Sequence, residues 1–224
     1  MTSNTQKEII IFGVSEIAEL AHFYFTTDSH YKVIAFTVDQ EFKTQETFCG
    51  LPVIAFEDLE NIYSPNQIGM FVCLGYSKIN QIRKQKYELI KSKGYELVSY
   101  VSSKATVLTK NIGDNAFILE DNTIQPFTKI GDNVVLWSGN HIGHHSKIGD
   151  HCFFASHIVV SGGVTIGECN FFGVNATLRD HIKVGDNCVI GAGCLILNDV
   201  EDNSLYIGQK THKAEIVSQQ LKKI

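Results

Sequence analysis

The apolar residues of this chain follow different periods in its two halves. In the first hundred residues, short apolar runs alternate with segments of helical spacing. This alternation indicates a small parallel α/β sheet. Residues 15–25 predict a helix with Ser15 as N-cap, and residues 77–94 predict an amphipathic helix that ends at Gly94. The predicted strands are residues 8–13, 31–39, 69–75 and 95–101. Residues 49–56 predict a short strand or an extended turn, and Pro52 within them fits a sheet edge.

In the second half, every sixth residue is apolar from Ile112 to Ile196, through fifteen hexads without an insertion. A repeated hexad is typical of a parallel β-helix, because neither a helix nor a strand has this period. Three hexads form one triangular coil of 18 residues, so fifteen predict five coils. In eight hexads a glycine follows the apolar residue, and we expect it to let the chain turn without steric cost. Small residues four places after the apolar one predict core packing for Cys152, Ala176, Cys188 and Cys194.

Composition and charge exclude several classes of protein. The chain is 44% hydrophobic and 19% charged, an ordinary globular balance. Its net charge of −5 gives no sign of nucleic-acid binding or of a membrane surface partner. The N-terminus is polar, and no apolar run approaches the roughly 20 residues that span a bilayer. We therefore expect a cytoplasmic protein without membrane insertion, whose six cysteines are reduced.

The segment 139–151, GNHIGHHSKIGDH, holds four histidines in thirteen residues. Histidine titrates near neutrality and is the commonest metal ligand. On a β-helix, residues eighteen apart stack, so His145 aligns with Gly163 and, two coils on, with His181. Those two histidines are roughly 10 Å apart, too far to share a metal ion. A zinc site is disfavoured for His141, His144 and His145, which surround a tight corner, and we interpret His151, His157 and His181 as surface residues.

The N-terminal segment IIIFGVSE, followed by the hexads, resembles the NeuD/PglD-like sugar acyltransferases of bacterial surface-glycan biosynthesis over nearly the full length. The resemblance implies an α/β plus all-β fold. A Rossmann-like parallel α/β domain over residues 1–101 would hold a nucleotide-linked sugar. A left-handed parallel β-helix would occupy residues 102–207, followed by a C-terminal tail over residues 208–224. The resemblance also implies a homotrimer that binds acetyl-CoA between neighbouring prisms and needs no metal.

The family carries its histidine base in the pattern I-x-H-[E/D], which here reads Ile142-Gly143-His144-His145. The resemblance makes His144 the general base, and an imidazole is suited to accept a proton at neutral pH. His145 stands in the position of the usual acid, and we count it with His144 as catalytic. A histidine can orient its neighbour but supplies no negative charge. Either Asp180 or Glu120 takes the place of the acid, or the base works without a carboxylate.

Further site residues follow from the resemblance. The acetyl-CoA contacts fall on Gly162, Val174 and Ala192, and the nucleotide-sugar contacts fall on Gly13, Ser15, Asp39 and Gly75. A dinucleotide site is not expected, because GVSEIA lacks the later glycines of GxGxxG.

Several residues have a less specific interpretation. Trp137 and Phe127 either shape an acceptor pocket or pack. Lys78 and Arg83 are interpreted as solvated. The segment 208–210 departs from the Gly-x-Pro that ends many related prisms, and we interpret residues 213–224 as a solvated helix, although Lys210 or Lys213 would also suit a CoA phosphate.

The leading hypothesis is an acetyl-CoA-dependent acyltransferase that acts on a nucleotide-linked sugar, with an amino sugar preferred, by direct attack on the thioester. Three alternatives stay open. The first is O-acetylation of sialic acid or another free sugar. The second is a non-catalytic β-helix scaffold. The third is a metal-dependent hydratase of the carbonic-anhydrase type, built from histidines of adjacent subunits.

Overall fold

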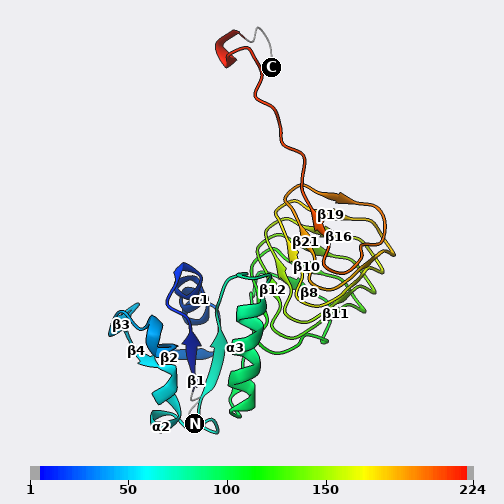
Figure 1. Cartoon of the computed structure of the whole chain (residues 1–224). Helices are drawn as coiled ribbons and strands as arrows, with labels where there is room; N and C mark the ends of the chain where they lie inside the picture. The colour runs from blue at the N-terminus through cyan, green and yellow to red at the C-terminus, as the bar shows by residue number, and fades with distance from the viewer. Residues whose placement is uncertain (1–5, 221–224) are drawn as a thin grey trace.

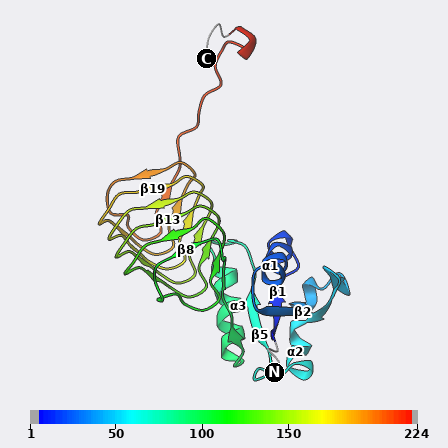
Figure 2. The same ribbon diagram turned by 180° about the vertical axis from the view of Figure 1, so that it is seen from behind.

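The chain forms an α/β domain that is joined side by side to a triangular prism of stacked coils, as the computed structural model shows (Figure 1). The structure describes residues 6–220. In the view from behind, helix α3 lies between the sheet of the α/β domain and the prism (Figure 2). The predicted succession of an α/β domain and a hexapeptide β-helix is confirmed.

The α/β sheet has the strand order β3-β4-β2-β1-β5-β6, and only the β3–β4 pair is antiparallel. Its strands are β1 (Lys7–Phe12), β2 (Tyr31–Val38), β3 (Thr47–Phe48), β4 (Leu51–Ala55), β5 (Gly69–Val72) and β6 (Glu96–Leu97). The edge position predicted from Pro52 is wrong, because the two-residue strand β3 covers β4. The predicted strand 95–101 is two strands: β6 closes this sheet, whereas β7 (Tyr100–Val101) pairs with β9 (Phe117–Ile118) of the prism.

The two long helices lie where the sequence pattern predicts them, with one shifted start. Helix α1 (Glu16–Thr27) begins after Ser15, whose side chain makes no capping hydrogen bond. Helix α3 (Gln81–Ser92) begins later than expected, because residues 78–80 all have positive φ. The remaining helices are the short α2 (Leu59–Ile62) and the 3₁₀ helices η1 (Gln40–Phe42), η2 (Phe56–Asp58) and η3 (Ser218–Gln220). No helix within residues 6–220 is long and apolar enough to cross a bilayer.

The prism has three faces, each a parallel sheet of two-residue strands. Face 1 contains β7, β9, β12 (Val135–Leu136), β15 (Phe153–Phe154), β18 (Phe171–Phe172), β21 (Val189–Ile190) and β23 (Leu205–Tyr206). Face 2 contains β8 (Thr106–Val107), β10 (Thr123–Ile124), β13 (His141–Ile142), β16 (Val159–Val160), β19 (Thr177–Leu178) and β22 (Leu195–Ile196). Face 3 contains β11 (Lys129–Ile130), β14 (Lys147–Ile148), β17 (Thr165–Ile166) and β20 (Lys183–Val184).

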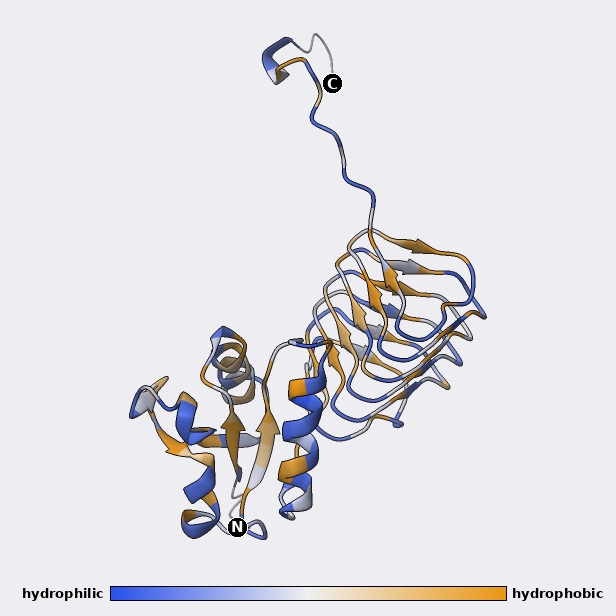
Figure 3. Cartoon of the chain, in the orientation of Figure 1, coloured by the Kyte–Doolittle hydropathy of each residue, from blue (hydrophilic) through white to orange (hydrophobic). Residues whose placement is uncertain are grey.

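The hexad residues fill the prism core, as predicted. Ile142 pairs with Val160, eighteen residues on, and both are fully buried. Figure 3 shows the resulting apolar strands alternating with polar corners. Every hexad residue from Ile118 to Ile196 is at most 3% exposed, and Cys152, Ala176, Cys188 and Cys194 pack among them. The prism extends beyond the hexad series at both ends, because β7, β8 and β23 add to its faces.

The glycines that follow the hexad residues do not make the turns, so that interpretation is wrong. The corner is turned two residues later, in the left-handed region, as at Gly139, Gly163 and Gly193. The earlier glycines instead allow the coils to stack closely. A methyl group at Gly143 would lie 2.5 Å from the carbonyl carbon of Ser161 in the next coil.

Arg83 is fully buried and fastens α3 to the prism, so its interpretation as a solvated residue is wrong. Its Nη1 donates to the carbonyl and side-chain oxygens of Asn133, and its Nη2 donates to the carbonyl of His151 at 2.8 Å and to Oδ1 of Asn80 at 3.1 Å. His151 is itself only 5% exposed, so its surface interpretation is also wrong. Acceptors from three segments therefore hold one cation between the two parts of the chain.

The segment after β23 extends away from the prism (Figure 1). Within the described part of the predicted tail helix, residues 213–217 are not helical and only η3 follows. The helix interpretation is therefore wrong there, and residues 221–224 lie outside the described part of the chain.

Candidate active site

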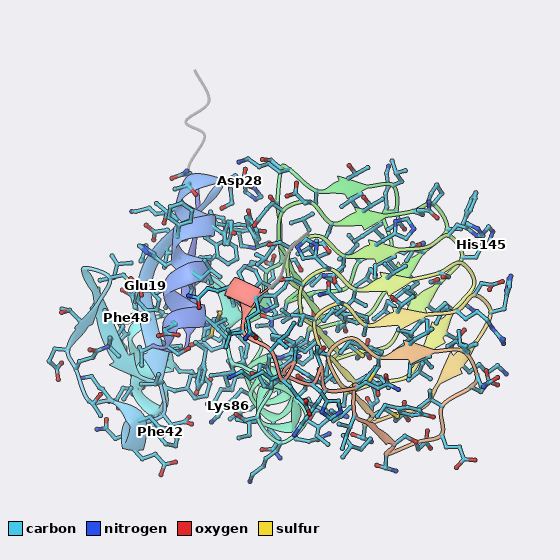
Figure 4. The ribbon with its side chains drawn as sticks, turned by 90° about the horizontal axis from the view of Figure 1, so that it is seen from above. Glu19, Asp28, Phe42, Phe48, Lys86 and His145 are labelled. Atoms are coloured by element: carbon cyan, nitrogen blue, oxygen red, sulfur yellow. The ribbon has the colours of Figure 1, made fainter. Side chains whose placement is uncertain are left out.

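The histidine-rich segment forms the corner of the prism between face 2 and face 3. Ile142 ends β13 and points into the core, and Ser146 is buried before β14 begins. Between them, His144 and His145 are exposed. Figure 4 shows His145 at the corner of the prism that is farthest from the α/β domain.

The backbone of each corner explains most of the histidines. The third residue after each hexad residue has positive φ at every corner from Asn115 to Gly193. Asparagine, aspartate, histidine and glycine adopt this conformation more readily than other residues. The histidines at this turn position are His145, His151, His157 and His181. His144 precedes the turn position, so its identity is not explained by backbone geometry.

The imidazole of His144 lies over the backbone of Gly162 in the next coil. A methyl group at Gly162 would lie 2.7 Å from Cε1 and 2.8 Å from Nε2 of that ring. The backbone of His144 is fixed from both sides: its N–H donates to Oε1 of Gln125 at 2.8 Å, and its carbonyl accepts from the Gly163 N–H at 2.8 Å. Within residues 6–220, Nε2 of His144 makes no hydrogen bond. The ring is thus held with this nitrogen open.

His144 and His145 contact each other through their ring nitrogens. The two Nδ1 atoms are 3.1 Å apart. The ring of His145 also packs on Phe127, with ring centroids 4.7 Å apart and an interplanar angle of 37°. Phe127 is 72% exposed and lies at this corner, because its ring contacts His145. Trp137 instead packs in the core between the α/β domain and face 1.

Neither proposed carboxylate contacts His144 in the chain. Glu120 accepts hydrogen bonds from the hydroxyls of Tyr24 at 2.6 Å and Ser138 at 2.7 Å. The nearest partner of Asp180 is His181, whose Nε2 is 3.8 Å from a carboxylate oxygen. Among the described residues, the hydrogen-bond partner of the His144 ring is therefore His145 alone.

The residues predicted to contact acetyl-CoA lie at two corners of face 2. Gly162 is at the His144 corner, whereas Val174 and Ala192 are at the corner shared with face 1. Val174 is 46% exposed. Beside Ala192, a hollow of about 440 Å³ is lined by residues 193–196 and 206–209. One chain does not enclose the three residues in a single pocket, and their role stays a prediction.

The residues predicted to contact the nucleotide sugar lie at the carboxyl edge of the α/β sheet. Ser15 and Gly75 line one hollow of about 640 Å³, together with Glu16, Glu19 and Phe48. Figure 4 shows Glu19 and Phe48 on the side of the molecule opposite His145. Ser15 and Gly75 are thus brought together, on a wall that also carries two carboxylates.

The other two predicted sugar contacts have structural partners of their own. A methyl group at Gly13 would lie 2.6 Å from the carbonyl oxygen of Cys73, so close packing of the strand ends requires glycine there. Asp39 is separate from the hollow and pairs with Lys86 at 2.6 Å. Lys86 also lies over the ring of Phe12, 5.4 Å from its centroid. Sequence reasoning missed Lys86, which gave no signal within a helix of many charges.

Gln125 is the second residue that sequence reasoning missed. It follows the hexad residue Ile124, where eight other hexads have glycine. The departure from that rule is a usable signal, because the side chain of Gln125 occupies the coil below His144 and accepts its N–H.

The cysteines do not form a nucleophilic site. All six are free, and five are buried. Burial raises the pKa of the Cys152 thiol to about 12, so its reactive thiolate is not populated at neutral pH. Within residues 6–220, no group of three or more His, Cys, Asp or Glu side chains is arranged to hold a metal ion.

Comparison with known proteins agrees with this geometry. The family described as bacterial transferase hexapeptide (six repeats) matches residues 109–144, 127–162 and 163–198. The acetyltransferase domain of PglB from Neisseria gonorrhoeae is 25% identical, with a TM-score of 0.81 over 90% of this chain and 97% of that one. The chain is an acyltransferase that carries the hexapeptide repeat and resembles the NeuD/PglD-like sugar acyltransferases.

Two further structures share the fold of this acyltransferase. A histidine-to-asparagine variant of perosamine N-acetyltransferase from Caulobacter crescentus, in complex with CoA and GDP-perosamine, is 22% identical, with a TM-score of 0.79 over 90% of this chain and 93% of that one. WeeI from Acinetobacter baumannii is 19% identical, with a TM-score of 0.76 over 90% and 97%. At these identities the likeness shows the shared architecture.

Proposed function

We propose that this acyltransferase moves the acetyl group of acetyl-CoA to the amino group of a nucleotide-linked sugar, with His144 as general base. The observation that carries the proposal is the exposed imidazole of His144, held over Gly162 with Nε2 free of hydrogen bonds. An uncharged imidazole in water-accessible surroundings is suited to accept a proton near neutral pH.

The reaction needs no enzyme nucleophile. The sugar nitrogen attacks the thioester carbon, the new C–N bond forms, and the amine proton passes to Nε2 of His144. The C–S bond then breaks, and the proton passes on to the leaving thiolate. Backbone N–H groups near the glycine-rich corner would stabilise the negative charge on the thioester oxygen. The buried, protonated cysteines are consistent with this direct route.

The donor and acceptor substrates are supported by separate observations. Acetyl coenzyme A is bound in a structure of the PglB domain, which is 24% identical to this chain, and GDP-perosamine with CoA in the Caulobacter enzyme. In this chain, the hollow beside Ala192 would suit the donor. The hollow at Ser15 and Gly75 would suit the sugar nucleotide, with its phosphates toward the backbone N–H groups that open α1. Glu16 and Glu19 line the same hollow and oppose this charge.

The distance between these two parts of the molecule supports assembly. The hollow at Ser15 is in the α/β domain, whereas His145 marks the opposite corner of the prism (Figure 4). A sugar held by one chain therefore meets the His144 of another copy. We infer a cytoplasmic homotrimer. The resemblance to NeuD/PglD-like acyltransferases implies three chains, whose prisms would lie side by side.

The test is thiol release from acetyl-CoA with UDP-, dTDP- and GDP-linked amino sugars, followed by mass analysis of the product. We expect one amino sugar to gain an acetyl group on nitrogen. The variant His144→Ala should lose at least about a hundredfold in kcat, because general-base catalysis contributes about 10²–10⁴. The control is His30→Ala, an exposed histidine of the α/β domain. The proposal would be overturned if none of these amino sugars released thiol from acetyl-CoA, or if the activity of His144→Ala were unchanged.

A further inference from the structure

The contact between His144 and His145 has room for a single hydrogen. Two ring nitrogens 3.1 Å apart form a hydrogen bond only when one carries a hydrogen and the other offers a lone pair. Two arrangements are possible. Either Nδ1–H of His144 donates to Nδ1 of His145, or Nδ1–H of His145 donates to Nδ1 of His144.

Only one arrangement leaves His144 able to act as a base. When Nδ1 of His144 carries the hydrogen, its Nε2 has a free lone pair and accepts the proton of the attacking amine. In the reverse arrangement Nε2 of a neutral His144 already carries a hydrogen. We propose that His145 is a positioning residue that accepts Nδ1–H of His144, and that this neutral acceptor replaces the carboxylate of related enzymes. The inference rests on the proposed role of His144.

Three contacts hold His145 in the orientation that this role requires. Its backbone takes the left-handed turn conformation, with φ of 59°. Its N–H donates to the carbonyl of Pro126 at 3.3 Å, and its ring packs on Phe127. The following residue, Ser146, is buried and donates to the carbonyl of Ser161 at 3.0 Å. Because these contacts hold the imidazole of His145 in place, it presents one ring nitrogen to His144 at little cost in conformational entropy.

Among residues 6–220, none supplies a negative charge within hydrogen-bond distance of the pair. The coil below contributes Gln125 and Phe127, and the coil above contributes Gly162 and Gly163, all neutral. The charged or titratable groups on the neighbouring elements are His141 on face 2, Lys129, Lys147 and Lys183 on face 3, and Arg179, Asp180 and His181 two coils above.

The absence of a carboxylate beside the base has a measurable consequence. Protonation of His144 places an imidazolium against a neutral imidazole, which shares the charge only weakly. A carboxylate in place of His145 would put a negative charge beside the imidazole of His144, and an opposite charge at this distance raises the pKa of an imidazole.

The direct test is the hydrogen position on each ring, measured by long-range ¹H–¹⁵N NMR on the full-length protein at pH 8. We expect His144 with hydrogen on Nδ1 and His145 with hydrogen on Nε2, a distinctive result because free imidazole side chains in water favour Nε2–H. His144→Gln and His145→Gln assign the signals. Hydrogen on Nε2 of His144 would overturn the inference. This measurement needs no substrate, so it is independent of whether the proposed reaction is found.

Two substitutions add a kinetic test. His145→Phe keeps the packing on Phe127 and removes the acceptor, and Phe127 itself shows that phenylalanine tolerates this turn position, with φ of 64°. We expect kcat to fall about tenfold or more with KM for acetyl-CoA within about twofold, because the base loses orientation rather than binding. The control is His30→Phe, whose exposed ring packs on Tyr31 in the same manner.

The second substitution, His145→Glu, supplies the carboxylate. We expect kcat to stay within about threefold of the wild type and the acid limb to move upward by about one pH unit. Wild-type kcat and an unchanged pH profile in both His145 variants would contradict the inference. Loss of activity in His145→Glu equal to that in His145→Phe would also contradict it, because the packing rather than the acceptor would then matter.

Discussion

The ring of His144 occupies the space that a side chain at Gly162 would fill. The two residues are eighteen apart, so they stack in neighbouring coils. A methyl group at Gly162 would lie 2.7 Å from Cε1 of the imidazole. Because Gly162 has no side chain, the coil that contains it leaves space for the imidazole of His144 in the preceding coil. This relationship separates Gly162 from the glycines that serve only the stacking of the backbone.

Gly162→Ala should reduce activity and leave the fold intact. The φ of Gly162 lies outside the left-handed region, so alanine is not strained there, and the clash is with a side chain that is free to rotate outward. We expect kcat to fall at least about tenfold with the midpoint of urea unfolding nearly unchanged. In a double-mutant cycle, Gly162→Ala should cost nothing further in a His144→Ala background. Additive losses would show that Gly162 acts elsewhere, for example on acetyl-CoA.

Gly143→Ala should have the opposite effect. Its methyl group would meet the backbone of Ser161 at 2.5 Å, and stacked backbone cannot move aside as a ring does. We expect a loss of several kcal/mol of unfolding free energy, or failure to fold, by the overpacking mechanism. Circular dichroism and urea unfolding of the two alanine variants, measured side by side, check the contrast. Equal stability of both would contradict the stacking role of the glycines that follow the hexad residues.

The stability of the protein should fall in mild acid because of His151. Burial, with Lys84 and Arg83 nearby, holds the pKa of His151 below its ordinary 6.5, and its Nδ1 accepts from Nδ2 of Asn133 at 2.9 Å. A lowered pKa means that the contribution is fully present above pH of about 6.5 and is lost as pH falls toward the folded-state pKa. Urea unfolding between pH 8 and 5 should show this loss.

The matched variant for this prediction is His151→Asn. Asparagine occupies the same turn position in the two preceding coils, at Asn115 and Asn133, with φ of 51° and 56°. The variant therefore keeps the turn and removes the titrating group. We expect its unfolding free energy to change less between pH 8 and 5 than that of the wild type. A parallel pH dependence in both proteins would assign the effect to other groups.

Arg83→Leu should strongly destabilise the contact between α3 and the prism. The substitution strands buried acceptors of Asn80, Asn133 and the His151 carbonyl, and each unsatisfied group costs about 1–3 kcal/mol. We expect a loss of at least about 3 kcal/mol in urea unfolding. The adjacent Lys84→Ala removes a partly exposed pair with Glu168 and should cost less than about 1 kcal/mol. Similar small losses of unfolding free energy in Arg83→Leu and Lys84→Ala would show that Arg83 does not hold α3 to the prism.

The period of the apolar residues was enough to predict the prism and its core, because a strict hexad has one structural solution. It did not reveal that the left-handed turn lies at the third residue after the hexad position. That rule, visible in Asn115, Asn133 and His145, would have explained the exposed histidines as turn residues. It would also have separated His144, which lies one residue earlier.

Other features depended on contacts between distant segments. The sequence alone predicts a solvated Arg83, and nothing local indicates that prism carbonyls surround it. The pairing of Asp39 with Lys86 joins a strand end to a helix 47 residues later. The sequence offers Glu120 as a partner for His144, but the carboxylate of Glu120 instead accepts a hydrogen bond from Tyr24 of the other domain. Such partners are fixed by how the α/β domain packs on the prism, which no sequence period encodes.

The most direct measurement is kcat for acetyl transfer by His144→Ala, with the identified amino-sugar nucleotide and acetyl-CoA both saturating. The variant must first show the circular dichroism and oligomeric state of the wild type. We predict a fall of at least about a hundredfold while His30→Ala keeps the wild-type rate. Turnover by folded His144→Ala at a rate close to that of the wild type would contradict the assignment of the base at this corner of the prism.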